Sequence, residues 1–131
     1  RLKELKGIEK VERYDTDAFH STASNTGRFT IPTGLGGRYL IGVNFEVAAA
    51  TDYSYIQVLL RLNGATTIAV LRHTPTTLSL GPVLSLFTIY SLVATDYIEA
   101  LVLQDNTAAA ARNVTFNARF SPEFALALLG A

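Results

Sequence analysis

The chain has 131 residues, with 11 basic and 11 acidic side chains and no cysteine. This length fits one domain, the zero net charge excludes the basic surface typical of nucleic-acid-binding proteins, and the lack of cysteine excludes disulfides, thiolate chemistry and cysteine-ligated zinc. Only 17% of the residues are charged, against about 25% in an average soluble domain, which favours burial of surface against further copies of the chain.

The N-terminal residues 1–13 differ in composition from the rest, because they mix many charges of both signs. Gly7 interrupts the spacing of the apolar residues there, so a short helical arm, a linker and an edge strand over 8–13 all remain open. We expect residues 1–13 to form a charged arm or tether and residues 14–131 to form the domain. The sequence has no methionine, so we expect it to be processed or to continue upstream of Arg1.

No run approaches the roughly 18 apolar residues of a membrane span, and charges stand where a secretory signal needs an apolar block. We therefore expect a soluble chain without a membrane partner. Small polar residues at 21–27 then predict a loop that leads into the first clear strand.

The stretch 27–47 predicts two strands joined by a glycine-rich corner. Phe29 and Ile31 alternate with polar residues until Pro32, which cannot donate to a sheet, and glycines at 34, 36 and 37 follow. A period of two over nine residues then places one set of side chains on a single face of a strand. That set is Tyr39, Ile41, Val43, Phe45 and Val47.

Further strands follow, separated by turn signals. Asn63-Gly64 between two β-rich runs predicts a hairpin with a type I′ turn, in which both central residues have positive φ. The remaining strands are predicted at 53–62, 65–72, 84–92, 97–104, 113–120 and 124–129. About eight or nine short strands with this spacing predict an all-β antiparallel sandwich or barrel.

Four motifs resemble the C1q/TNF-like domain in its bacterial and phage form. The opening is Tyr-Asp-Thr-Asp at 14–17, then Thr-Gly-Arg-Phe-Thr-Ile-Pro at 26–32 and Gly-Arg-Tyr-Leu-Ile at 37–41. The others are Val-Leu-Leu-Arg-Leu-Asn-Gly at 58–64, Leu-Val-Ala-Thr-Asp-Tyr-Ile-Glu at 92–99 and Phe-Ser-Pro-Glu-Phe-Ala-Leu at 120–126. Thr95 stands where the family usually has glycine.

The resemblance implies a ten-stranded jelly roll that assembles as a homotrimer, with apolar residues of one sheet packed at the three-fold axis. The sequence agrees indirectly, because several strands carry apolar residues on the face opposite the predicted core, and a sheet that is apolar on both faces must bury both. The candidate residues for this trimer interface are Leu40, Leu59, Leu101 and Leu103.

Catalytic patterns are missing from the sequence. No nucleophile elbow, phosphate-binding glycine loop or zinc-protease helix occurs, so we expect no enzymatic activity, catalytic residues or cofactor. Asp15 and Asp17, with His20 nearby, could share a calcium ion that a trimer completes. The alternative, which we favour, is that both aspartates cap turns and no metal binds.

We therefore expect a virion structural protein, a trimeric knob that decorates a capsid or caps a fibre on the phage particle surface. The alternative is a trimeric head of a phage tail or bacterial surface appendage, which binds a glycan or receptor through loop aromatics such as Tyr53 and Tyr55. A soluble signalling ligand, as in eukaryotic members of the family, is a third possibility that the absence of cysteine disfavours.

Overall fold

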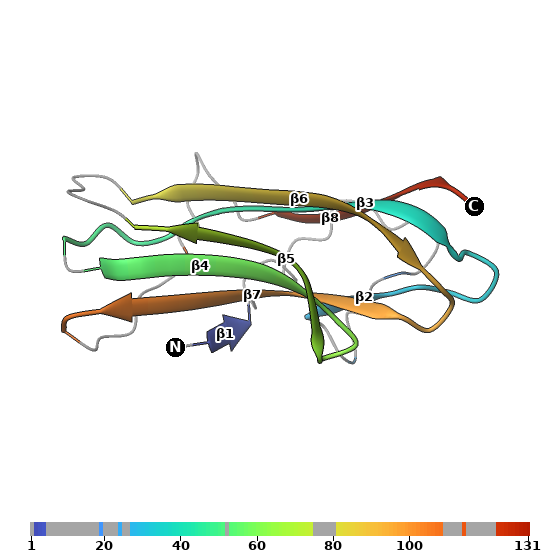
Figure 1. Cartoon of the computed structure of the whole chain (residues 1–131), viewed down its shortest axis with the longest axis horizontal. Helices are drawn as coiled ribbons and strands as arrows, with labels where there is room; N and C mark the ends of the chain where they lie inside the picture. The colour runs from blue at the N-terminus through green and yellow to red at the C-terminus, as the bar shows by residue number, and fades with distance from the viewer. Residues whose placement is uncertain are drawn as a thin grey trace.

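A computed structural model of the chain contains two antiparallel sheets that face each other as a β-sandwich (Figure 1). The structure describes residues 2–4, 19, 24, 27–51, 53–74, 81–108, 114 and 123–131. The regular elements in this part of the chain are all strands, so the all-β prediction is confirmed. No helix among the described residues has the length and apolar character to cross a membrane.

One sheet has five strands and the other has three. The five-stranded sheet has the order β1-β7-β4-β5, and β2 also pairs with β7. The three-stranded sheet has the order β6-β3-β8. The strands are β1 (Leu2–Glu4), β2 (Arg28–Thr30), β3 (Gly37–Glu46), β4 (Tyr53–Leu62), β5 (Thr66–His73), β6 (Val83–Leu92), β7 (Tyr97–Asn106) and β8 (Glu123–Gly130).

The core lies between the two sheets and is built from the predicted alternation. Every second residue of β3 points inward, and the opposing residues of β4 and β7 do the same. The fully buried side chains of these strands include Tyr39, Ile41, Val43, Phe45, Ile56, Val58, Leu60 and Ile98. Their apolar area, removed from water, is the main stabilising contribution to the sandwich.

The predicted limits of β4 to β8 agree with the structure to within two residues. β4 spans the predicted residues, whereas β7 and β8 extend one or two residues beyond the prediction. Leu2–Glu4, part of the predicted arm, pairs with β7 as a strand of the larger sheet. The possible strand at 8–13 lies outside the described residues, and of the strand predicted at 113–120 only Val114 is described, in a bridge to Val47.

The Asn63-Gly64 turn between β4 and β5 has the predicted geometry. Asn63 and Gly64 have φ values of 51° and 72°, and the Ala65 amide donates to the Leu62 carbonyl at 3.1 Å. Positive φ at both central residues is the signature of a type I′ turn. Thr95 also has a positive φ, 75°, at the position where the resemblance leads one to expect glycine.

Replacement of Gly64 by valine is expected to destabilise the fold by about 1–3 kcal/mol, because a β-branched residue resists positive φ. The new Cβ would also lie 2.8 Å from the Tyr97 hydroxyl oxygen. Urea unfolding of Gly64→Val measures this loss. Thr95→Gly is the matched control and should raise the unfolding midpoint, since it relieves a positive φ. An unchanged midpoint in Gly64→Val would contradict the type I′ assignment.

Candidate functional site

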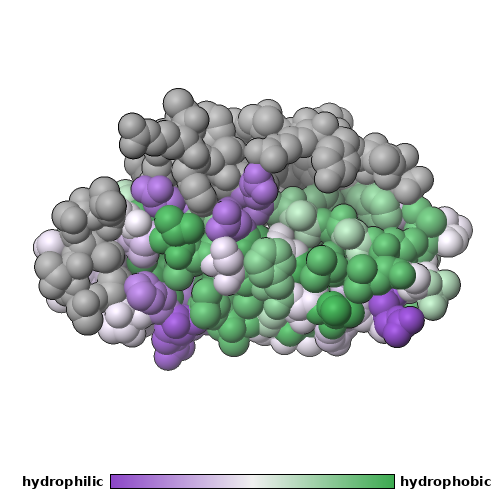
Figure 2. All heavy atoms as spheres, turned by 90° about the horizontal axis from the view of Figure 1, so that it is seen from above, coloured by the Kyte–Doolittle hydropathy of each residue, from purple (hydrophilic) through white to green (hydrophobic). Residues whose placement is uncertain are grey.

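The outer face of the three-stranded sheet exposes a continuous apolar surface. Residues directly opposite each other in antiparallel strands lie on the same face, and Leu40 pairs with both Ile89 and Ala127, while Gly42 pairs with Phe87 and Ala125. We name this set of residues the apolar face: Leu40, Gly42, Phe87, Ile89, Ala125 and Ala127. Figure 2 looks onto the side of the molecule where β6 lies in Figure 1, and hydrophobic side chains gather there.

Two side chains dominate the apolar face. Phe87 is 63% exposed and Ile89 is 61% exposed, and their neighbour Leu40 is 39% exposed. Single exposed apolar residues are ordinary, but a contiguous group of large ones marks an interaction site in soluble proteins. This group is therefore the best candidate for a functional surface among the described residues.

The absence of a side chain at Gly42 leaves room for the Phe87 ring. A Cβ atom at residue 42 would stand 2.4 Å and 2.5 Å from two carbons of that ring. The ring therefore occupies the space that a side chain on the central strand would fill.

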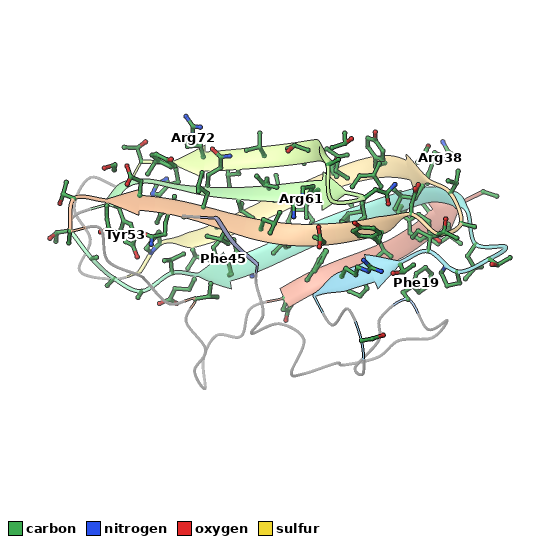
Figure 3. All side chains as sticks on the ribbon, turned by 90° about the horizontal axis from the view of Figure 1, so that it is seen from below. Phe19, Arg38, Phe45, Tyr53, Arg61 and Arg72 are labelled. Carbon is green, nitrogen blue, oxygen red and sulfur yellow. The ribbon has the colours of Figure 1, made fainter. Side chains whose placement is uncertain are left out.

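Polar residues border the apolar face along β3. Arg38 is exposed at one end, where Figure 3 labels it, and Glu46 lies at the other end, opposite Val83. Between the centre and Glu46, the Ser85 hydroxyl donates to Asn44 Oδ1 at 2.7 Å. An apolar centre with a polar border is the usual anatomy of a protein interface.

The outer face of the five-stranded sheet has a different character, because several of its charges are paired within the sheet. Arg61 Nη2 lies 3.2 Å from Glu99 Oε2 in an ion pair across β4 and β7. The guanidinium carbon of Arg28 lies 4.0 Å from the centre of the Tyr97 ring. Arg28 Nε is buried and has no hydrogen-bond partner among the residues that the structure describes, and the cation–π contact places the guanidinium against an aromatic face.

Arg72 contacts Gln57 and Tyr55 at the other end of the same outer face. Its Nε and Nη2 donate to Gln57 Oε1 at 2.9 Å and 2.8 Å, and its guanidinium carbon lies 5.0 Å from the centre of the Tyr55 ring. Figure 3 shows Arg72 projecting away from the sandwich. Tyr55, predicted as a ligand-facing aromatic, is therefore a half-buried strand residue beside an exposed cation.

Tyr53, the second predicted ligand-facing aromatic, lies inside the sandwich. Its side chain is 7% exposed, and its hydroxyl donates to the Ala48 carbonyl at 2.7 Å. The pairing of β4 with β7 shifts register between Tyr53 and Tyr55. Such a shift changes which side chains face the core, so Tyr53 points inward and Tyr55 outward. Tyr53 thus belongs to the core and not to a surface of the single chain.

The four predicted interface leucines lie on two different surfaces. Leu40 belongs to the apolar face, whereas Leu59 and Leu101 are paired on the outer face of the five-stranded sheet. Leu103 lies on that second face as well, opposite Gln57. Leu101 is only 4% exposed, and Leu59 and Leu103 are half-buried. One flat interface cannot contain all four, since the outer faces of the two sheets point in opposite directions.

Sequence reasoning missed Phe87 and Ile89 as surface residues. The run 83–92 is apolar at both alternating positions near its centre, so its periodicity did not show which side faces the core. Ser85 and Ser91 could have shown which side of this strand faces solvent. Both serines are exposed and lie on the same face as Phe87 and Ile89.

Three of the motif segments behind the family resemblance, 26–32, 58–64 and 92–99, meet at one corner of the sandwich. The Ile31 amide donates to the Asp96 carbonyl at 2.8 Å, and the Thr95 amide donates to the Ile31 carbonyl at 2.9 Å. Asn63 Nδ2 donates to Asp96 Oδ1 at 2.8 Å. Comparison with protein-family models and with curated proteins finds no match to this chain.

The predicted calcium ligands Asp15 and Asp17, and His20, lie outside the described residues. Among the residues that the structure does describe, no three histidines, aspartates or glutamates come close enough to hold a metal ion. The favoured interpretation of both aspartates as turn caps stays a prediction.

Calcium is expected to leave the melting temperature of the purified protein unchanged. A ligand that binds only the folded state must raise the melting temperature by mass action, so a calcium titration followed by thermal unfolding measures any site. A rise that disappears in Asp15→Asn would instead establish a metal site at this loop. Magnesium in the same assay controls for a general effect of divalent ions.

Proposed function

We propose that this chain is a non-enzymatic virion structural protein, a homotrimeric jelly-roll knob that decorates a capsid or caps a fibre on the phage particle surface. The single observation that carries the proposal is the exposed apolar face on β3, β6 and β8. The virion assignment itself comes from the resemblance to C1q/TNF-like domains of the bacterial and phage type.

The strand order supports the jelly-roll part of the proposal. Each sheet combines strands that are distant in the sequence, since β3 lies between β6 and β8 while β7 lies between β2 and β4. Consecutive strands such as β3 and β4 therefore belong to opposite sheets, as do β6 and β7. Such crossings between two antiparallel sheets are typical of Greek-key sandwiches, of which the jelly roll is one.

The apolar face supports assembly with further copies of the same chain. The low proportion of charged residues leaves little polar surface, and the most exposed large side chains on β6, Phe87 and Ile89, adjoin each other on one face. Obligate interfaces between copies are more apolar than other surfaces. The family resemblance sets the number of copies at three, with this face at the axis and the polar ends of β3 at its border.

Leu40 is the predicted interface residue that this proposal retains. The three leucines of the larger sheet, Leu59, Leu101 and Leu103, fall on the face directed away from such an axis. In the proposed trimer that outer face points away from the axis, toward a capsid or fibre lattice.

A binding head remains the second candidate, and one observation favours it. Arg72 is exposed, positively charged and held in place by Gln57 and Tyr55, on the outer face that the trimer would leave free. A fixed guanidinium suits the carboxylate of a glycan or receptor. Such a head would act at a phage tail or on a bacterial cell surface.

Gene context separates these two candidates. A neighbouring capsid or maturation-protease gene supports the decorating knob, whereas a neighbouring tail gene supports the binding head. Binding of the purified protein to assembled capsids, compared with binding to bacterial cells, tests the same difference directly.

The variant Ile89→Asp is expected to convert a trimer into monomers. A carboxylate at residue 89 would be buried unpaired in each copy, and an unpaired buried charge costs several kcal/mol. Light scattering at micromolar concentration measures the mass, which should be three times 14.2 kDa for the unchanged chain. Ser91→Asp is the matched control, since residue 91 is exposed on the same strand and face but beyond the large apolar side chains.

Two results would contradict this proposal. An unchanged chain that scatters as a monomer of 14.2 kDa would remove the trimeric knob. A stable dimer that Ile89→Asp dissociates would keep the apolar face as an interface but remove the three-fold assembly. Circular dichroism of each variant shows that a change in mass is not caused by unfolding.

A further inference from the structure

The side chain of Asn63 is held at both of its polar atoms. Asn63 Nδ2 donates to Asp96 Oδ1 at 2.8 Å, and Asn63 Oδ1 accepts the Tyr97 amide at 2.9 Å. The backbone amide of Asn63 also donates to the Tyr97 carbonyl at 2.9 Å. We name this set of hydrogen bonds the corner clamp.

Asp96 is itself fixed, which makes the corner clamp rigid. Its second carboxylate oxygen, Oδ2, accepts the Val93 amide at 2.9 Å, and its backbone amide donates to the Val93 carbonyl at 3.1 Å. Asn63 is therefore tied to a carboxylate that cannot rotate without losing bonds of its own.

Asn63 is followed by Gly64, and it is the one asparagine in the sequence followed by glycine. Asparagine is a thermolabile residue. Its side-chain Cγ can be attacked by the backbone nitrogen of the next residue, which is most accessible when that residue is glycine, without a side chain. Both residues are exposed to solvent at the tip of the hairpin.

The reaction has a balanced course. The Gly64 nitrogen bonds to Asn63 Cγ and gives up its proton, the Cγ–Nδ2 bond breaks, and ammonia leaves, so that a cyclic succinimide forms. Water then adds to either carbonyl of the ring and opens it to aspartate or isoaspartate. No oxidant or reductant is needed, and water is the only co-reactant.

We propose that Asn63 is a latent deamidation site that the corner clamp protects in the folded protein. Attack by Gly64 requires Asn63 Cγ to turn toward its own backbone, and this movement breaks the bonds to Asp96 and Tyr97 together. The site therefore reacts only when the corner opens.

The product prevents the corner from closing again. An aspartate at residue 63 has no side-chain N–H to donate and places a second carboxylate against Asp96. Isoaspartate lengthens the backbone inside a turn that requires positive φ at two consecutive residues. Molecules in which the corner clamp has broken thus accumulate aspartate or isoaspartate at residue 63.

Peptide mass mapping tests the proposal, because trypsin releases residues 62–72 with Asn63 as their only asparagine. After incubation in mildly alkaline buffer, the folded protein should deamidate at Asn63 at least tenfold more slowly than the same protein in concentrated guanidinium. In guanidinium, Asn63 should react much faster than Asn44, which is followed by phenylalanine. The variant Asp96→Ala should lose most of the protection, and Asp96→Asn, which keeps the acceptor oxygen, should retain more of it.

Equal rates in buffer and in guanidinium would show that the corner clamp does not protect Asn63. No deamidation in guanidinium would show that the site is not latent at all. Both results come from the unchanged chain, so they stand even where Asp96→Ala does not fold.

Discussion

The inner face of β3 must be removed from water, and the sandwich is built around this constraint. The inward residues of β3, Tyr39, Ile41, Val43 and Phe45, are completely or almost completely buried against the larger sheet. Its outward face presents Leu40 and Gly42 between two other apolar strands. On that face Leu40, Phe87 and Ile89 form a contiguous exposed apolar group, which marks an interaction site in soluble proteins. The sandwich buries the inner face of β3, and further copies of the chain are proposed to bury the apolar face.

The turn between β6 and β7 is bonded both to the turn between β4 and β5 and to the segment that follows β2. β6 belongs to one sheet and β7 to the other, so the turn that carries Asp96 connects the two layers. Asn63 and Ile31 both bind this turn. These hydrogen bonds bring together segments that are far apart in the sequence. Deamidation of Asn63 is expected to remove the bond from its side chain to Asp96.

Alternation and turn chemistry predicted most of the described strands, the buried face of β3 and the type I′ turn, because these depend on neighbours in the sequence. The placement of Leu40 apart from Leu59 and Leu101 was not predictable, since alternation shows which side chains leave the core but not which sheet carries them. Tyr53 and Tyr55 would share one face of a regular strand, and only the irregular pairing with β7 places one inside and one outside.

The central claim is that the apolar face is buried between copies of the chain. The sequence contains no tryptophan, so Phe87→Trp introduces a single fluorescent reporter at the centre of this face. At micromolar concentration the account predicts blue-shifted emission from a buried indole, which moves to the red when Ile89→Asp is added to the same chain. Emission typical of a water-exposed indole at all concentrations, with no response to Ile89→Asp, would contradict it.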